Sequence, residues 1–159
     1  MTTAPETGTQ LDPHLGRPVQ VLLVEDSPSD AAMTIEAMHE GRIVNQVHVA
    51  TDGEMAMAFL RRQGTFAEAP RPDLILLDLN LPRMDGREVL REVKDDPILK
   101  TIPVIVLTTS AAEEDILKSY ELHANAYVTK PVAFEAFFSA VRGIEDFWLA
   151  LVHLPQQGQ

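Results

Sequence analysis

The sequence predicts an α/β protein in which a parallel five-stranded sheet is covered by helices on both faces. Short apolar runs alternate with amphipathic stretches along most of the chain, which is typical of repeated strand–helix units. Two of these runs, DLILLDL (73–79) and PVIVL (103–107), are almost continuously apolar. Strands that are buried on both faces have this composition, and strands joined through helices run parallel.

The first strand is predicted over residues 19–24 (VQVLLV), an apolar run that Glu25 and Asp26 follow directly. The next segment, SPSD, supplies capping residues and an early proline, which favour the start of a helix. We expect this helix to continue through AAMTIEAMHE and to end at Gly41.

The second strand–helix unit has the same order. Residues 44–50 alternate between apolar and polar types as a strand does, and residues 52–63 (DGEMAMAFLRRQ) are predicted to form a helix closed by Gly64. A polar, proline-containing loop then leads to the third strand, 73–79, whose apolar run is interrupted only by Asp78.

The second half repeats this alternation. We predict a helix over 87–95, a strand over 103–107, an amphipathic helix over 112–122 and a short strand over 126–129. One face of a long last helix is marked by apolar residues at helical spacing: Phe134, Phe137, Phe138, Val141, Ile144, Trp148 and Leu151.

Composition narrows the class of function. The 159 residues include 13 Lys plus Arg against 24 Asp plus Glu, and a net charge of −11 disfavours binding to nucleic acid or anionic membranes. The absence of cysteine excludes disulfides and thiolate metal sites. The sequence has no recognisable signal peptide and no membrane-length apolar stretch, so we expect a cytoplasmic protein. The expected organisation is a flexible tail (1–18), one domain (19–149) and a C-terminal extension (150–159).

Polar side chains stand at the ends of four predicted strands. Glu25 and Asp26 follow the first, Asp78 ends the third, Thr108 follows the fourth and Lys130 follows the fifth. Because the carboxyl ends of parallel strands lie at one edge of a sheet, we expect these groups to line one crevice.

Neighbouring carboxylates repel unless a cation lies between them, and the oxygen ligands favour Mg²⁺, with Mn²⁺ as the alternative. Asp78 is a competent nucleophile for forming an acyl phosphate, and Lys130 would hold a phosphoryl oxygen. Taken singly, the acidic pair, Thr108 and Lys130 have simpler roles as a solvated turn, a strand-end hydroxyl and a loop lysine. Asp78 differs, because a charge in an apolar strand is costly to bury without a partner. Only the set points to chemistry.

The runs VLLVEDSPSD, PDLILLDLNLPRMDG, PVIVLTTS and AYVTKP resemble the receiver domains of two-component response regulators over residues 19–149. The spacings agree as well: Asp78 precedes Thr108 by thirty positions, and Thr108 precedes Lys130 by twenty-two. The resemblance implies a flavodoxin-like (βα)5 doubly wound fold with strand order 2-1-3-4-5.

The resemblance also implies a role for each residue of the acidic site. Asp78 would be the phosphoacceptor. Asp26 and the backbone carbonyl of Asn80 would bind Mg²⁺ together with Asp78, while Glu25 would act indirectly. Pro82 and Gly86 would shape the loop after the acceptor strand.

Further roles concern the phosphoryl group and the switch. Thr108 and Lys130 would contact the phosphoryl group, and the bond between Lys130 and Pro131 would be cis. Tyr127 occupies the place of an aromatic switch that follows the movement of Thr108. The responding face would comprise residues 112–122, the fifth strand and the last helix.

The loop GTFAEAPRPDLILLDLNLPRMDGREVL and the tail IEDFWLALVHLP resemble the small single-domain regulators partnered with bacterial phytochrome histidine kinases. This implies a sensor histidine kinase as phosphoryl source and a downstream protein or relay partner, because we expect no room for an attached output domain. Apolar residues beyond a minimal receiver predict a homodimer, and the candidates are Phe147, Trp148, Leu151 and Val152.

Two other functions remain open. An aspartyl-phosphate hydrolase also uses a strand-end Asp with Mg²⁺, Thr and Lys, but it needs an acid two positions after the nucleophile, where this chain has Asn80. A receiver-like interaction module that is never phosphorylated would normally lack one of the key residues, and none is missing. The sequence therefore favours a phosphoacceptor signalling protein over an enzyme.

Overall fold

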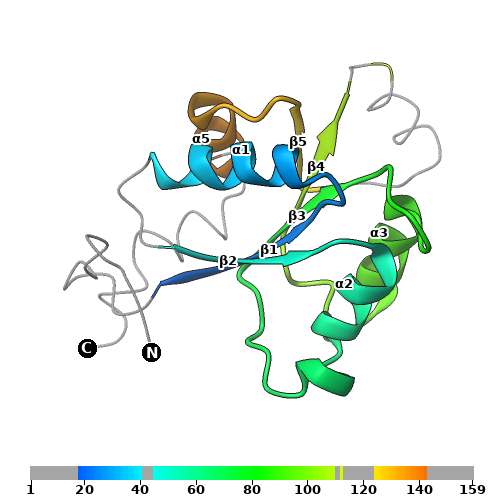
Figure 1. Ribbon diagram of the computed structural model, residues 1–159. Helices are drawn as coiled ribbons and strands as arrows, with labels where there is room; N and C mark the ends of the chain where they lie inside the picture. Colours follow the sequence, from blue (N-terminus) through cyan, green and yellow to red (C-terminus); the bar gives the residue numbers. More distant parts are fainter. Residues whose placement is uncertain (1–17, 41–44, 110–111, 113–123, 143–159) are drawn as a thin grey trace.

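The computed structural model describes residues 18–40, 45–109, 112 and 124–142. Within these ranges, no helix is both long and apolar enough to cross a membrane. Figure 1 shows α1 and α5 on one face of a sheet and α2 and α3 on the other. The elements, in chain order, are β1 (Val19–Val24), α1 (Pro28–His39), β2 (Asn45–Ala50), α2 (Gly53–Leu60), η2 (Gly64–Phe66), β3 (Leu74–Asp78), α3 (Gly86–Asp95), β4 (Val104–Thr108), β5 (Ala126–Thr129) and α5 (Phe134–Arg142).

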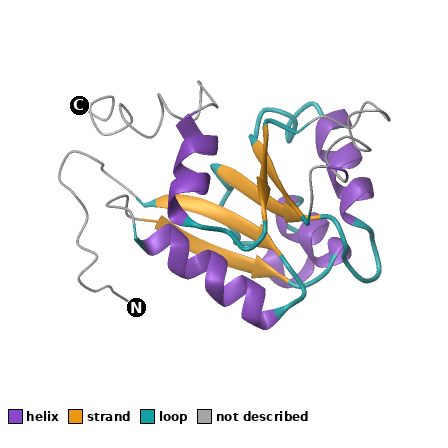
Figure 2. Ribbon diagram, turned by 90° about the horizontal axis from the view of Figure 1, so that it is seen from above, coloured by secondary structure: helices purple, strands orange, loops and turns teal. Residues whose placement is uncertain are grey.

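The sheet has the strand order β2-β1-β3-β4-β5 and every neighbouring pair is parallel. The predicted doubly wound fold and its strand order are therefore confirmed. Figure 2, seen from above, shows helices on both sides of the strands. The register pairs Asp78 with Leu107 and Thr108 with Thr129, so that β3, β4 and β5 end close together. This alignment forms the edge on which the polar residues stand.

Successive side chains of the central strands go to opposite faces of the sheet, as the pleat requires. Leu22 and Leu77 belong to a core cluster with residues of α2 and α3, whereas Leu23 and Leu76 pack with residues of α1 and α5. All four are fully buried. Because these strands are buried on both faces of the sheet, their sequences are continuous apolar runs.

The first two helices begin where their capping residues predict. The Ser27 hydroxyl accepts a hydrogen bond from the Asp30 N–H at 3.2 Å, and Pro28 occupies the first turn. The Asp52 carboxylate accepts from the Met55 N–H at 2.7 Å. Both caps stand directly after strands, so each helix starts at the carboxyl edge of the sheet.

The end of α2 corrects the prediction that Gly64 closes this helix. The helix ends at Leu60, and the N–H groups of Arg62 and Gln63 donate to carbonyls of its last turn at 3.2 and 2.9 Å. Arg62 itself takes the left-handed conformation (φ 54°) that such a cap needs, a place usually held by glycine. Gly64 (φ 60°) serves the following turn instead.

Some predicted features lie outside the described residues. They include Gly41, nearly all of the helix expected over 112–122, and the tails. The dimer candidates Phe147, Trp148, Leu151 and Val152 also lie there.

Candidate functional site

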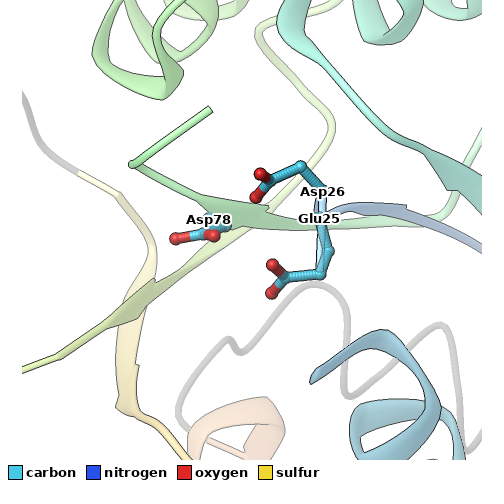
Figure 3. A group of neighbouring side chains, drawn as sticks. All are labelled: Glu25, Asp26 and Asp78. Carbon is cyan, nitrogen blue, oxygen red and sulfur yellow. The ribbon is translucent and has the colours of Figure 1, made fainter. Parts of the chain in front are cut away.

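The structure brings the polar residues predicted at the strand ends into one site. One carboxylate oxygen from each of Glu25, Asp26 and Asp78 lies within 4.8 Å of the other two. Figure 3 shows the three side chains pointing to the same side of the sheet edge. Glu25 and Asp78 are almost completely buried, at 1% and 4% exposure, whereas Asp26 is exposed. The site therefore has a buried floor and one carboxylate that is open to solvent.

The Lys130 ammonium enters this site from the end of β5. Its Nζ lies 2.7 Å from Glu25 Oε1, 3.0 Å from Asp30 Oδ2 and 3.2 Å from Asp78 Oδ2. The contact with Glu25 is an ion pair without good hydrogen-bond geometry, while the contacts with Asp30 and Asp78 are hydrogen bonds. The peptide bond between Lys130 and Pro131 is cis, as the resemblance implies. One cation thus neutralises part of a strongly acidic cluster.

Burial and charge act against each other on the site's titrating groups. Burial alone lowers the pKa of Lys130, but its contacts with Glu25 and Asp30 and the charge of Asp78 outweigh burial and raise it above its ordinary value. Burial raises the pKa of Glu25; Lys130 opposes this, and the charge of Asp78 adds to it. The negative charge of the carboxylates in this cluster therefore exceeds the positive charge of the one lysine.

Asp78 is held by the end of its own strand. Its Oδ1 accepts a hydrogen bond from the Asn80 N–H at 3.3 Å, and its Oδ2 accepts from Lys130. A carboxylate in an apolar strand is costly without such partners. These two contacts, one of them with a cation, explain how Asp78 remains in an otherwise apolar strand.

Gly86 fixes the position of the loop that follows Asp78. Its N–H donates to the Leu79 carbonyl at 3.0 Å, and a Cβ on this residue would lie 2.4 Å from the backbone oxygen of Asp78. Only a residue without a side chain allows this approach. The glycine therefore brings the start of α3 close against the strand end that carries Asp78.

Thr108 stands at the end of β4 with its hydroxyl buried. The residue is 1% exposed, and among the described residues its Oγ1 has no hydrogen-bond partner. A buried hydroxyl without a partner is unfavourable, and such groups are rare in folded proteins. Thr108 ends the strand next to the one that carries Asp78.

Tyr127 lies on β5, partly buried against the core cluster of α2 and α3. Its hydroxyl accepts a hydrogen bond from the Ala124 N–H at 3.2 Å. The side chain therefore packs between the sheet and the segment before β5, next to the strand that ends in Thr108.

The donor set fits a hard divalent cation, because every candidate ligand atom is an oxygen. Asp26 is exposed, and a carboxylate oxygen of Asp78 lies within 4.8 Å of it. Glu25 is already engaged, since Lys130 contacts one of its oxygens and the Ser27 N–H donates to the other at 3.2 Å. Asp78 has the same kind of partners on both of its oxygens, and Asp26 is the one carboxylate of the three that is exposed to solvent.

Sequence reasoning missed Asp30. Its carboxylate contacts Lys130, although the two residues are 100 positions apart. The one signal in the sequence is its place in the first turn of α1, which starts at the carboxyl edge of β1. An acidic residue in that place also has an ordinary role as part of a helix start.

Comparison with known proteins agrees with this geometry. The profile of the response regulator receiver domain matches residues 21–142. Response regulator Rcp1 of Synechocystis is 52% identical over 138 residues, which cover 87% of this chain and 94% of Rcp1. The crystal structure of the Mn²⁺-bound form of Rcp1 gives a TM-score of 0.68 at 52% identity and covers 83% of this chain and 95% of that chain.

Two further solved structures are similar. The bacteriophytochrome response regulator RtBRR gives a TM-score of 0.76 at 43% identity, over 81% of this chain and 79% of that chain. The phosphorylated cyanobacterial phytochrome response regulator RcpA gives a TM-score of 0.69 at 51% identity, over 84% of this chain and 96% of that chain. With the profile match, the fold and the clustered strand-end residues in agreement, the chain belongs to the response regulator receiver domain family.

Proposed function

We propose that this receiver accepts a phosphoryl group from a sensor histidine kinase on Asp78 and signals through the resulting change of its surface. One observation carries the proposal: Asp78 is a buried carboxylate close to a cation and two further carboxylates. The adjacent strand ends in Thr108, whose buried hydroxyl lacks a partner among the described residues. Such a site receives an anionic group and stabilises the charge on it.

In the transfer step, a carboxylate oxygen of Asp78 attacks the phosphorus of the donor. A new P–O bond forms as the donor's P–N bond breaks, and the histidine side chain leaves with its electron pair. Lys130 would exchange part of its contact with Asp78 for a phosphoryl oxygen, and the Thr108 hydroxyl would donate to another. The residues of the chain orient the group and offset its charge.

A divalent cation would be held by Asp26, Asp78 and the backbone carbonyl of Asn80. When bound, Mg²⁺ neutralises charge on the transferred group. The all-oxygen donor set supports this assignment, as does the Mn²⁺ named for the Rcp1 structure. Mg²⁺ is the proposed ion, with Mn²⁺ as a substitute.

The proposed output is a shift between two conformations. Movement of Thr108 towards the phosphoryl group would leave space beside β4, and Tyr127 would turn into that space. The partly buried position of Tyr127 on the adjacent strand supports this coupling. The responding face would comprise β5, α5 and residues 112–122, and a downstream or relay protein would bind there.

Rcp1, RtBRR and RcpA support a narrower assignment, because RtBRR and RcpA are named as phytochrome response regulators. We propose that the kinase is a bacterial phytochrome, and that the receiver acts in the cytoplasm as a homodimer through its last helix. Sedimentation showing a strict monomer, with and without a phosphodonor, would exclude the dimer.

Asn80 favours a signalling role over hydrolysis of external substrates. Its backbone N–H contacts Asp78, but an amide side chain has no proton of suitable acidity to give to a leaving group. The phosphoryl group on Asp78 is therefore expected to act as a signal. An unphosphorylated interaction module remains the alternative.

The test is incubation with Mg²⁺ and a small acyl phosphate, followed by intact mass measurement. The wild-type chain is expected to gain one phosphoryl mass that Asp78→Asn lacks. Asp85→Asn is the matched control, because it removes a carboxylate from the following loop and is expected to be labelled like wild type. Equal labelling of Asp78→Asn and wild type would refute the assignment.

A further inference from the structure

A second feature lies at the opposite end of the sheet from Asp78. The segments before β3 and β4 and the end of α2 surround an open hollow of about 380 Å³. We call it the arginine pocket, because Arg61, Arg62 and Arg71 line it together with the apolar Leu60, Pro72 and Leu99. Its residues precede β3 and β4, whereas the site at Asp78 follows them.

The charge of this pocket contrasts with that of the whole chain. A protein with a net charge of −11 places three of its thirteen basic residues in one hollow. Arg61 is paired with Glu92 at 2.9 Å, but Arg62 and Arg71 have no carboxylate partner within the part of the chain that the structure describes. Among the described residues, Arg71 donates only to the neutral Thr101 hydroxyl, at 2.7 Å. Two guanidinium groups therefore remain available to an anion.

The carboxylate within the pocket does not neutralise these arginines. Asp96 Oδ1 accepts hydrogen bonds from the N–H groups of Ile98 and Leu99, at 2.7 and 3.1 Å. Asp96 therefore caps the turn that follows α3, and its Oδ1 is engaged by backbone N–H groups. Arg61 and Arg62 follow the carboxyl end of α2, where a positive charge interacts favourably with the helix dipole. That reason does not apply to Arg71, which belongs to the segment before β3.

The pocket also offers an apolar anchor. Ile98 lines the pocket and is 71% exposed, which is a high exposure for a large apolar side chain. Leu60 and Leu99 also line the pocket and are buried. An apolar contact surrounded by polar and charged groups is the usual plan of a protein interface. Its occupant needs an apolar side chain with negative charges on both sides.

From this combination we propose that the arginine pocket docks an acidic peptide segment of a partner protein, with one apolar residue seated against Ile98 and carboxylates on Arg62 and Arg71. Arginine binds carboxylates through two parallel hydrogen bonds, which gives such contacts direction. The pocket is separate from the phosphoacceptor site, so this docking is independent of Asp78.

The test uses the ¹⁵N-labelled full chain and a synthetic peptide, Glu-Asp-Leu-Asp-Glu, blocked at both ends. Amide shifts are expected to change around the pocket, and replacing the peptide's leucine by serine is expected to weaken binding. Arg62→Glu with Arg71→Glu should raise Kd about tenfold or more. Arg87→Glu with Arg91→Glu makes the same charge change on α3 outside the pocket and should change Kd far less.

Two further variants test the apolar contact and the independence of the pocket from Asp78. Ile98→Ser should weaken binding while the fold, followed by circular dichroism, stays intact. Asp78→Asn should bind the peptide as wild type does. The proposal is wrong if the peptide does not bind, if its shifts map elsewhere, or if both arginine pairs affect Kd equally.

Discussion

Replacing Thr108 by valine should make the protein more stable while impairing its switch. Thr108 is 1% exposed, and its Oγ1 is buried with no hydrogen-bond partner among the described residues. A buried polar group left without a partner costs about 1–3 kcal/mol, and valine has nearly the same shape without the hydroxyl. We therefore expect the free energy of unfolding to rise by about 1–2 kcal/mol, which for a chain of this length raises Tm by about 3–6 °C.

The assay is urea unfolding, followed by far-UV circular dichroism, with calorimetry for Tm. Thr34→Val is the control, because Thr34 is equally buried but lies on α1; it should give no comparable gain. The Thr108 variant should still be labelled on Asp78, but the NMR signals of Tyr127 should no longer shift on phosphorylation. A Thr108→Val protein less stable than wild type would show that the hydroxyl has a favourable partner, and would refute the reasoning.

Three further predictions follow from individual contacts. Gly86→Ala should lower the free energy of unfolding by about 1–3 kcal/mol and slow the labelling of Asp78, because the new Cβ would press on backbone atoms. In the control Gly64→Ala the new Cβ has no atom within 4 Å, so labelling should be unchanged. Arg62→Gly should raise the free energy of unfolding by about 1 kcal/mol, since glycine adopts φ 54° without strain; unchanged urea midpoints would contradict this. Burial lowers the pKa of His48, so the unfolded chain takes up a proton that the folded chain resists, and stability should fall as pH drops through about 6.5 and then level off below the folded pKa. In His48→Gln this part of the pH dependence of stability should vanish. If stability changes with pH identically in wild type and in His48→Gln, His48 is not its source.

Much of the site was predictable because strand ends can be read from the sequence. An apolar run that stops at a charged residue places that residue at the edge of a sheet, which is how Glu25, Asp26 and Asp78 were found. Lys130 was found by its position after the fifth run. Asp30 was missed because nothing local distinguishes an acid in the first turn of a helix from an ordinary helix start.

The resemblance to a known family supplied what the residues alone did not, including the strand order. Parallel strands joined by helices can be ordered in several ways, and the apolar pattern of each run is the same in all of them. Gly86 was expected to shape its loop, but the reason depends on a 2.4 Å approach to the backbone of Asp78 that no pattern encodes.

The sequence by itself determined the fold class, the positions of the strands and the presence of an acidic site at their ends. These features depend on local periodicity, which each segment carries independently. Only the tertiary structure decided that Lys130 is shared by three carboxylates, that the Thr108 hydroxyl is left unpaired among the described residues and that three arginines surround one hollow. Each of these depends on side chains from distant segments meeting at a particular distance, and packing of the whole domain sets that distance.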